Sequence, residues 1–145
     1  MERNRFAPQR KCFSNQFVLV FSLFFMNDIL LIVSGDLQFR SEIQLSARQE
    51  SVECYFVSYG DHLSELVKRT NPFLLVADFA AQGTEWIMKH LSEIKVMRSQ
   101  FPIVGIISEA LEADVIRLER AGCDHVLTRE QFFRKFSSIV TKYLR

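Results

Sequence analysis

The polar residues of this chain that could take part in a reaction or bind a ligand come just after runs of apolar residues. Asn71 to Asp78 contains a turn dipeptide, five apolar residues and then a carboxylate, which is typical of a strand buried on both faces of a parallel sheet. In open parallel α/β sheets, reactive and ligand-binding groups lie outside the carboxyl ends of the strands. Asp78 is at such an end, and Ser34, Asp36 and Arg129 follow other apolar runs. These four polar residues are too few to name a reaction.

Common catalytic and cofactor motifs do not occur in the sequence. It has no GxxxxGK[ST] or GxGxxG loop, and no Ser/His/Asp or Cys/His set at telling positions. Cys12, Cys54 and Cys123 are far apart and form no CxxC pair, which predicts reduced, buried thiols in a cytoplasmic protein. We expect His90 and His125 to be surface or half-buried residues rather than metal ligands.

Length and composition predict one ordinary globular domain. The chain has 145 residues, of which 48% are hydrophobic and 24% are charged. Its net charge of +1 is uneven, because residues 1–25 carry +3 and the remainder carries −2. A body with a charge of −2 has no general attraction for nucleic acid, so we do not expect binding to DNA or RNA.

Residues 1–26 are interpreted as an N-terminal extension, and residues 27–145 as the domain. Four basic residues precede an apolar run from Phe17 to Met26, which is also the pattern of a signal peptide. Three interpretations stay open: an upstream extension of the reading frame with Met26 as the natural start, a signal or membrane-associating segment, and an extra packed helix. The run lacks a small-x-small cleavage site and is too short to span a bilayer, which favours the first interpretation.

From Ile29 onward the pattern alternates between strands and helices. We expect strands at 29–33, 52–58, 72–78, 103–107 and 126–127. We expect helices at 37–50, 85–99, 113–121 and 131–144, and a short helix capped by Asp61 and ended by Asn71. Such alternation predicts right-handed crossovers and a doubly wound five-stranded parallel sheet, covered by helices on both faces.

The order of these landmarks resembles the receiver domain of response regulators in two-component systems, of the chemotaxis-regulator kind. The resemblance covers 29–145 nearly end to end and implies the flavodoxin-like (βα)5 fold. The similar segments are 30–36 followed by Arg40 (first strand, acidic turn and first helix), 72–78 (third strand), 102–108 (fourth strand) and Ala121-Gly122-Cys123-Asp124 (the turn before the fifth strand).

The resemblance implies a phosphorylation site of which this chain keeps only a part. Asp78 matches the phosphoacceptor aspartate. The two acidic positions that hold Mg²⁺ in the family fall on Ser34 and Gly35, and Asp36 comes one residue late. Mg²⁺ held by Asp78 with only a backbone carbonyl and water would bind weakly, and no other cofactor is indicated. For Asp36 two roles stay open, a metal ligand and a cap of the helix that follows.

The second half of the implied site is altered as well. The family's hydroxyl position falls on Ile107, and Ser108, the candidate phosphoryl contact, comes one residue late. Successive side chains of a strand point to opposite faces of the sheet. A residue one position beyond the family's position therefore does not necessarily take over its role. Arg129 stands at the lysine position, Glu130 at the proline position and Val126 at that of the aromatic switch residue.

These losses lead to the hypothesis of a stand-alone degenerate receiver, or pseudo-receiver, in phosphorelay signalling. Asp78 is then either a phosphoacceptor or a retained carboxylate that pairs with Arg129 or caps the next loop. The expected partner is a protein: a histidine kinase, a phosphotransfer protein or a downstream regulator. The family's contact face corresponds to about Asp114 to Tyr143.

The hypothesis includes several negative expectations and one alternative. We expect a cytoplasmic monomer or homodimer that is not an enzyme and touches no membrane outside residues 1–26. The alternative is a flavodoxin-like domain that binds a small ligand, or runs an unrelated reaction, at the same sheet edge.

Overall fold

The computed structural model describes residues 28–58, 60–81 and 84–144, so the expectations for residues 1–26, including Cys12, lie outside the described residues. The described strands are β1 (Ile29–Val33), β2 (Glu53–Val57), β3 (Leu74–Asp78), β4 (Ile103–Ile107) and β5 (His125–Thr128). The described helices are α2 (Leu37–Gln49), α3 (Leu63–Thr70), α4 (Thr84–Met97), α5 (Glu112–Ala121), α6 (Arg129–Arg134) and α7 (Phe136–Tyr143). None of these helices is both long and apolar enough to cross a membrane.

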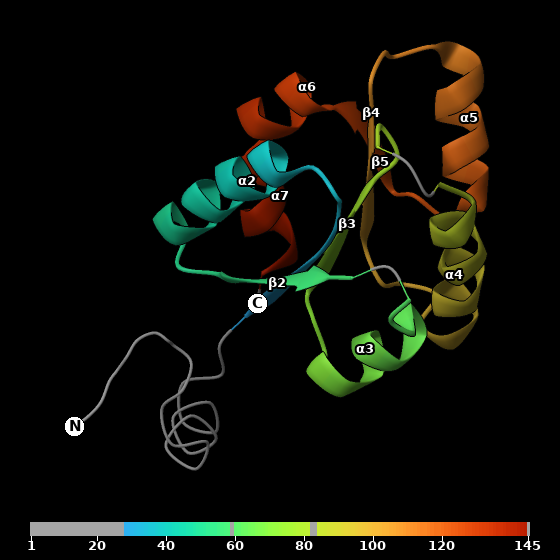
Figure 1. Cartoon of the computed structure of the whole chain (residues 1–145), viewed down its shortest axis with the longest axis horizontal. Coiled ribbons are helices and arrows are strands. Elements are labelled where there is room, and N and C mark those ends of the chain that lie inside the picture. The colour runs from blue at the N-terminus through green and yellow to red at the C-terminus, as the bar shows by residue number, and fades with distance from the viewer. Residues whose placement is uncertain (1–27, 59, 82–83, 145) are drawn as a thin grey trace.

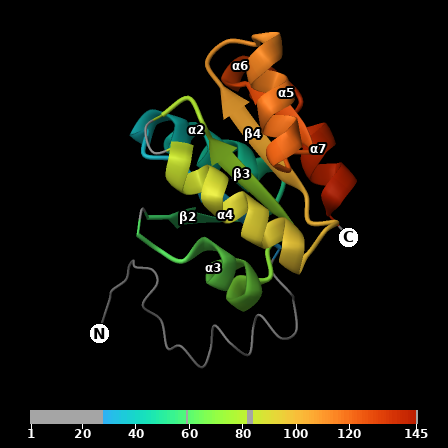
Figure 2. The same cartoon turned by 90° about the vertical axis from the view of Figure 1, so that its right-hand side faces the viewer.

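The strands of the described chain form one five-stranded parallel sheet in the order β2-β1-β3-β4-β5. Helices α2, α6 and α7 lie on one side of this sheet, and α3, α4 and α5 lie on the other (Figure 1). Figure 2 shows the second side, where α4 and α5 run along β3 and β4. The predicted doubly wound parallel fold is therefore confirmed, and the carboxyl ends of β1, β3 and β5 meet at one rim.

Alternation along the strands divides the interior into two cores. In β1, Leu30 and Ile32 pack with the residues of α2, α6 and α7, whereas Leu31 and Val33 pack with those of α3, α4 and α5. All residues of β3 and β4 are buried, as a continuous apolar run predicts for a central strand. The rim thus stands on a rigid, closely packed base.

The end of the chain differs from its prediction. The prediction of a single helix at 131–144 is wrong, because the segment forms two helices, α6 and α7, that are separated at Lys135. Four apolar side chains of this segment are nevertheless buried: Phe132, Phe136, Ile139 and Val140. The rings of Phe132 and Phe136 meet edge to face at 5.4 Å. No glycine or proline stands at the break, so the sequence pattern offers no signal for it.

Two expectations about polar residues are also wrong. Asp61 does not cap α3: its carboxylate accepts a hydrogen bond from the backbone N–H of Ser58 at 3.1 Å, and His62 is the N-cap residue. His90 is buried, with 6% of its surface exposed, rather than a surface or half-buried residue. His125 is half-buried as expected and lies 2.7 Å from the Tyr143 hydroxyl.

The described cysteines agree in part with the expectation of reduced, buried thiols. Cys54 is half-buried, Cys123 is buried, and both are free. Burial raises the pKa of Cys54 to about 11 and the pKa of Cys123 to about 12. Both groups are therefore thiols at neutral pH, and the nucleophilic thiolate form is scarce.

Candidate functional site

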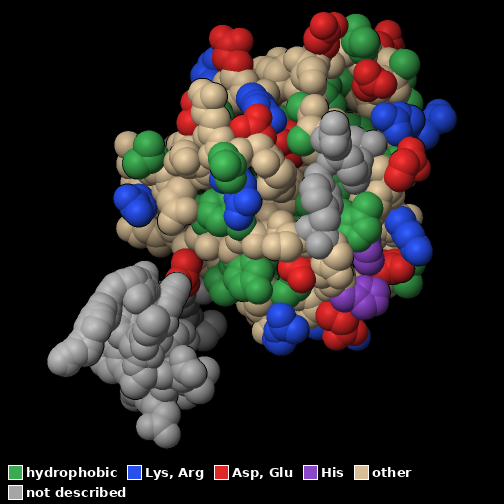
Figure 3. All heavy atoms as spheres, viewed as in Figure 1, with side chains coloured by type: hydrophobic (Ala, Val, Ile, Leu, Met, Phe, Trp, Pro, Cys, Tyr) green, Lys and Arg blue, Asp and Glu red, His purple; other side chains and the backbone are tan. Residues whose placement is uncertain are grey.

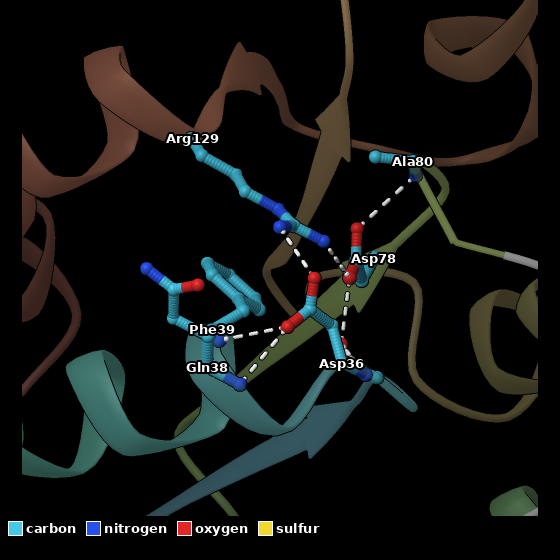
Figure 4. Close-up of polar contacts among 7 residues, drawn as sticks. Asp36, Gln38, Phe39, Asp78, Ala80 and Arg129 are labelled. Carbon is cyan, nitrogen blue, oxygen red and sulfur yellow. Dashed lines mark hydrogen bonds and ion pairs between the residues drawn. The ribbon is translucent and has the colours of Figure 1, made fainter.

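Asp78 ends the central strand β3, and its side chain is completely buried at 0% exposure. One carboxylate oxygen, Oδ1, accepts a hydrogen bond from the backbone N–H of Ala80 at 3.1 Å. The other, Oδ2, accepts from the hydroxyl of Ser34 at 2.6 Å and from the guanidinium of Arg129 at 2.8 Å (Figure 4). A buried carboxylate requires such partners, and here they engage both of its oxygens.

Arg129 reaches this position from the far side of the rim. It is the first residue of α6, whose start is fixed by a capping box between Thr128 and Gln131. The Thr128 hydroxyl accepts from the backbone N–H of Gln131 at 3.2 Å, and the Gln131 side chain accepts from that of Thr128 at 3.0 Å. Because β4 lies between β5 and β3, the arginine side chain passes the end of β4 to meet Asp78.

The guanidinium of Arg129 joins two carboxylates. Nη2 donates to Asp78 and Nη1 donates to Asp36, both at 2.8 Å, and the group lies over the ring of Phe39 at 4.7 Å from its centroid. Burial alone would lower the pKa of Arg129, but the hydrogen bonds and charges of the two aspartates outweigh it and raise that pKa. The rim therefore contains a permanent cation between two carboxylates.

Asp36 is the N-cap of α2. Its Oδ1 accepts from the backbone N–H groups of Gln38 at 2.9 Å and Phe39 at 3.1 Å, and its Oδ2 accepts from Arg129. Of the two roles left open by the sequence, the structure contains the cap, and a role as metal ligand stays a prediction. A cation shared by Asp36 and Asp78 would have to displace the guanidinium that now bonds to both.

The charge of Asp36 should make stability depend on pH. The hydrogen bond from Arg129, and then that from the Phe39 N–H, lower the pKa of Asp36 in the folded state. A carboxyl with a lowered folded pKa stabilises the fold above its unfolded pKa, and this contribution is lost as the pH falls through the folded value. We expect Asp36→Asn to flatten the loss of stability below about pH 4, measured by urea unfolding between about pH 3 and 6. Glu42→Gln, an exposed position on α2, is the control, and equal slopes in wild type and Asp36→Asn would contradict the prediction.

A cleft of about 450 Å³ opens beside the Asp36–Arg129–Asp78 network. Its lining residues are Asp36, Ala80, Ala81, Ile107, Ser108, Thr128, Arg129 and Glu130. Ser108, the candidate phosphoryl contact, is exposed there, whereas Asp78 is not among the lining residues. The cleft therefore offers a hydroxyl and a guanidinium to a ligand, but not the carboxylate that would act as the nucleophile.

Sequence reasoning anticipated the pairing of Asp78 with Arg129, and it missed two supporting residues. The sequence places Ser34 at this edge of the sheet but does not predict its contacts: its hydroxyl donates to Asp78 and accepts from the backbone N–H of Asp36 at 3.1 Å. Phe39 supplies the ring beneath the guanidinium. A buried serine directly after a strand is a signal that could have identified the first residue, whereas Phe39 has the pattern of any core residue of an amphipathic helix.

Comparison with known proteins identifies the fold. No family model matches the chain, and no curated protein matches it. Among solved structures, the chain is similar to a response regulator from Hahella chejuensis (TM-score 0.69, 15% identity, 81% of this chain and 96% of that one). It is also similar to the chemotaxis protein CheY4 of Vibrio cholerae (TM-score 0.68, 10% identity, 81% and 99%) and to a CheY-like protein, tadZ, of Pseudomonas aeruginosa (TM-score 0.69, 13% identity, 81% and 94%). The expected fold of response regulator receiver domains is thereby confirmed.

Proposed function

We propose that this chain, which has the receiver fold, is a pseudo-receiver that binds a signalling protein in one fixed state. The observation that carries this proposal is the complete burial of Asp78, whose two carboxylate oxygens are both engaged by other groups. A phosphoacceptor must expose one oxygen to the phosphodonor. Here Oδ2 of Asp78 accepts hydrogen bonds from Ser34 and Arg129, Oδ1 accepts one from the Ala80 N–H, and Asp78 does not line the cleft.

The electrostatics of the rim also argue against phosphoryl transfer. In-line transfer to a carboxylate depends on Mg²⁺ to neutralise the charge that develops on the phosphoryl oxygens. Mg²⁺ needs several oxygen ligands in octahedral geometry. In this chain one carboxylate oxygen of Asp36 and one of Asp78 accept hydrogen bonds from Arg129. The other oxygen of each accepts from backbone N–H groups. The guanidinium therefore competes directly with a metal ion for both carboxylates.

The partner is proposed to be a histidine kinase, a phosphotransfer protein or a downstream regulator, in the cytoplasm. The contact face is proposed to run over α5, β5 and the last two helices, from about Asp114 to Tyr143. Ile116, a large apolar side chain on this face, is 39% exposed, and Leu111, the N-cap residue of α5 just before the face, is 55% exposed. Both side chains are available for contact with another protein. Binding, rather than catalysis, is the proposed activity.

Incubation with acetyl phosphate and Mg²⁺, followed by intact mass measurement, tests the proposal. We expect no phosphoryl adduct on the wild-type chain, and the same spectrum for Asp78→Ala. A receiver of ordinary activity treated in parallel shows that the phosphodonor is competent. A stable adduct on the wild type that is absent from Asp78→Ala would overturn the pseudo-receiver proposal, and binding of a protein partner should be unchanged by the treatment.

A second candidate function is favoured by the cleft itself. Its volume of about 450 Å³ lies within the range of small-molecule sites, and Ser108, Arg129 and Glu130 supply polar groups at its wall. A flavodoxin-like domain that binds a small ligand at this edge would carry that ligand through purification. Flavin or nucleotide detected by absorbance and mass in the purified chain would favour this function over the first.

A further inference from the structure

A cluster of two histidines and a glutamate joins α3 to α4, away from the Asp78 rim. His62 is the N-cap residue of α3, and His90 and Glu93 are three residues apart on one face of α4. One potential ligand atom from each residue lies within 4.8 Å of the other two. In Figure 3, histidine side chains lie together over the region where α3 and α4 lie in Figure 1, with acidic side chains beside them.

The His90 ring is held by its neighbours, and one of its ring nitrogens lacks a hydrogen-bond partner among the described residues. Its ring packs edge to face against Trp86, at 5.0 Å between centroids, and against His62, at 5.5 Å. Only 6% of the residue is exposed, and its buried Nδ1 has no hydrogen-bond partner among the described residues, although Glu93 Oε1 is 3.3 Å away. A buried polar atom without a partner is costly, and in native proteins it calls for an explanation.

We propose that His62, His90 and Glu93 form a binding site for a divalent transition metal ion, with Zn²⁺ as the reference ion. Imidazole nitrogen and carboxylate oxygen are favoured ligands of Zn²⁺, and two histidines with one glutamate leave a fourth position open for water. An ion bound through His90 Nδ1 would satisfy an atom that has no hydrogen-bond partner among the described residues. The site makes no use of Asp78.

The geometry requires only a small adjustment to hold the ion. Ligands of a tetrahedral Zn²⁺ lie about 3.3 Å apart, given metal–ligand distances of about 2.0–2.1 Å. The exposed side chain of His62, and that of Glu93, which is 43% exposed, can rotate toward the fixed ring of His90. The Ser64 hydroxyl donates to Glu93 Oε1 at 3.4 Å, which resembles the outer hydrogen bonds that orient metal ligands.

Calorimetric titration of the untagged full chain with Zn²⁺ tests the site. We expect one ion per chain with micromolar affinity, and an affinity at least about tenfold lower in both His62→Gln and Glu93→Gln. Both residues are exposed, so these variants should fold as the wild type does. His125→Gln removes a histidine outside the cluster and should keep the affinity of the wild type.

Co²⁺ provides a second readout, because its absorption reports the coordination of the bound ion as well as its presence. We expect a visible absorption band of a four- or five-coordinate Co²⁺ ion in the wild type and in His125→Gln, and its loss in His62→Gln. Zinc binding that is unchanged in both cluster variants would show that the ion sits elsewhere and would overturn the site. Absence of saturable Zn²⁺ binding below about 100 μM would overturn it too.

Discussion

Replacing Arg129 with methionine should lower the free energy of unfolding by about 3 kcal/mol. Arg129 supplies the opposite charge for Asp78, which is completely buried at the end of β3. Methionine keeps much of the apolar length of the side chain. The loss therefore reflects a buried carboxylate that keeps its hydrogen bonds from Ser34 and the Ala80 N–H but has lost its opposite charge. Urea unfolding followed by circular dichroism measures this loss.

A second substitution separates the charge from the packing. Asp78→Asn in the Arg129→Met background should recover part of the lost stability, because an amide without an ionic partner costs less to bury than a carboxylate. Arg134→Met is the matched control, since Arg134 lies in the same helix, is 63% exposed, and should change stability by no more than about 0.5 kcal/mol. If Arg129→Met were as mild as Arg134→Met, the ion pair would not support the rim.

Phe39→Ala should cost about 3–5 kcal/mol of stability and should also loosen the rim. Phe39 is fully buried, and its ring meets Phe132 at 6.1 Å and Phe133 at 5.6 Å. The guanidinium of Arg129 also lies over this ring, 4.7 Å from its centroid. Truncation therefore leaves a cavity between α2 and α6 and removes the surface on which the guanidinium lies.

Thermal unfolding and calorimetry measure the effect of Phe39→Ala. Phe39→Leu should lose much less, because most of the buried volume is kept. Leu37→Ala, two residues earlier and 72% exposed, is the surface control and should lie within about 0.5 kcal/mol of the wild type. A loss for Phe39→Ala below about 1 kcal/mol would mean that α2 and α6 can close around the missing ring.

The sequence predicted the central part of the fold well because its physical signals are local and strong. The runs Ile29–Val33 and Ile103–Ile107 are bounded by turn residues, and the strands occur with those bounds. The pairing of Asp78 with Arg129 was also anticipated, because both follow strands whose carboxyl ends share one rim.

Features that depend on packing between distant elements were not predictable in the same way. The break at Lys135 has no glycine or proline to mark it. The burial of His90 depends partly on His62, the N-cap residue of another helix, and a pattern within one helix does not report that contact. The hydrogen bond from Arg129 to Asp36 joins residues 93 positions apart in the sequence. The spacing of apolar residues within helices and strands cannot predict a contact at that separation.

The guanidinium between Asp36 and Asp78 amounts to a counter-ion tethered to the backbone. A dissolved cation occupies such a place in proportion to its concentration and loses translational freedom when it binds. A charge carried on a capped helix has a fixed effective concentration and has lost that freedom already during folding. The charge balance at the rim is thus supplied by the polypeptide itself and does not require a cation from solution.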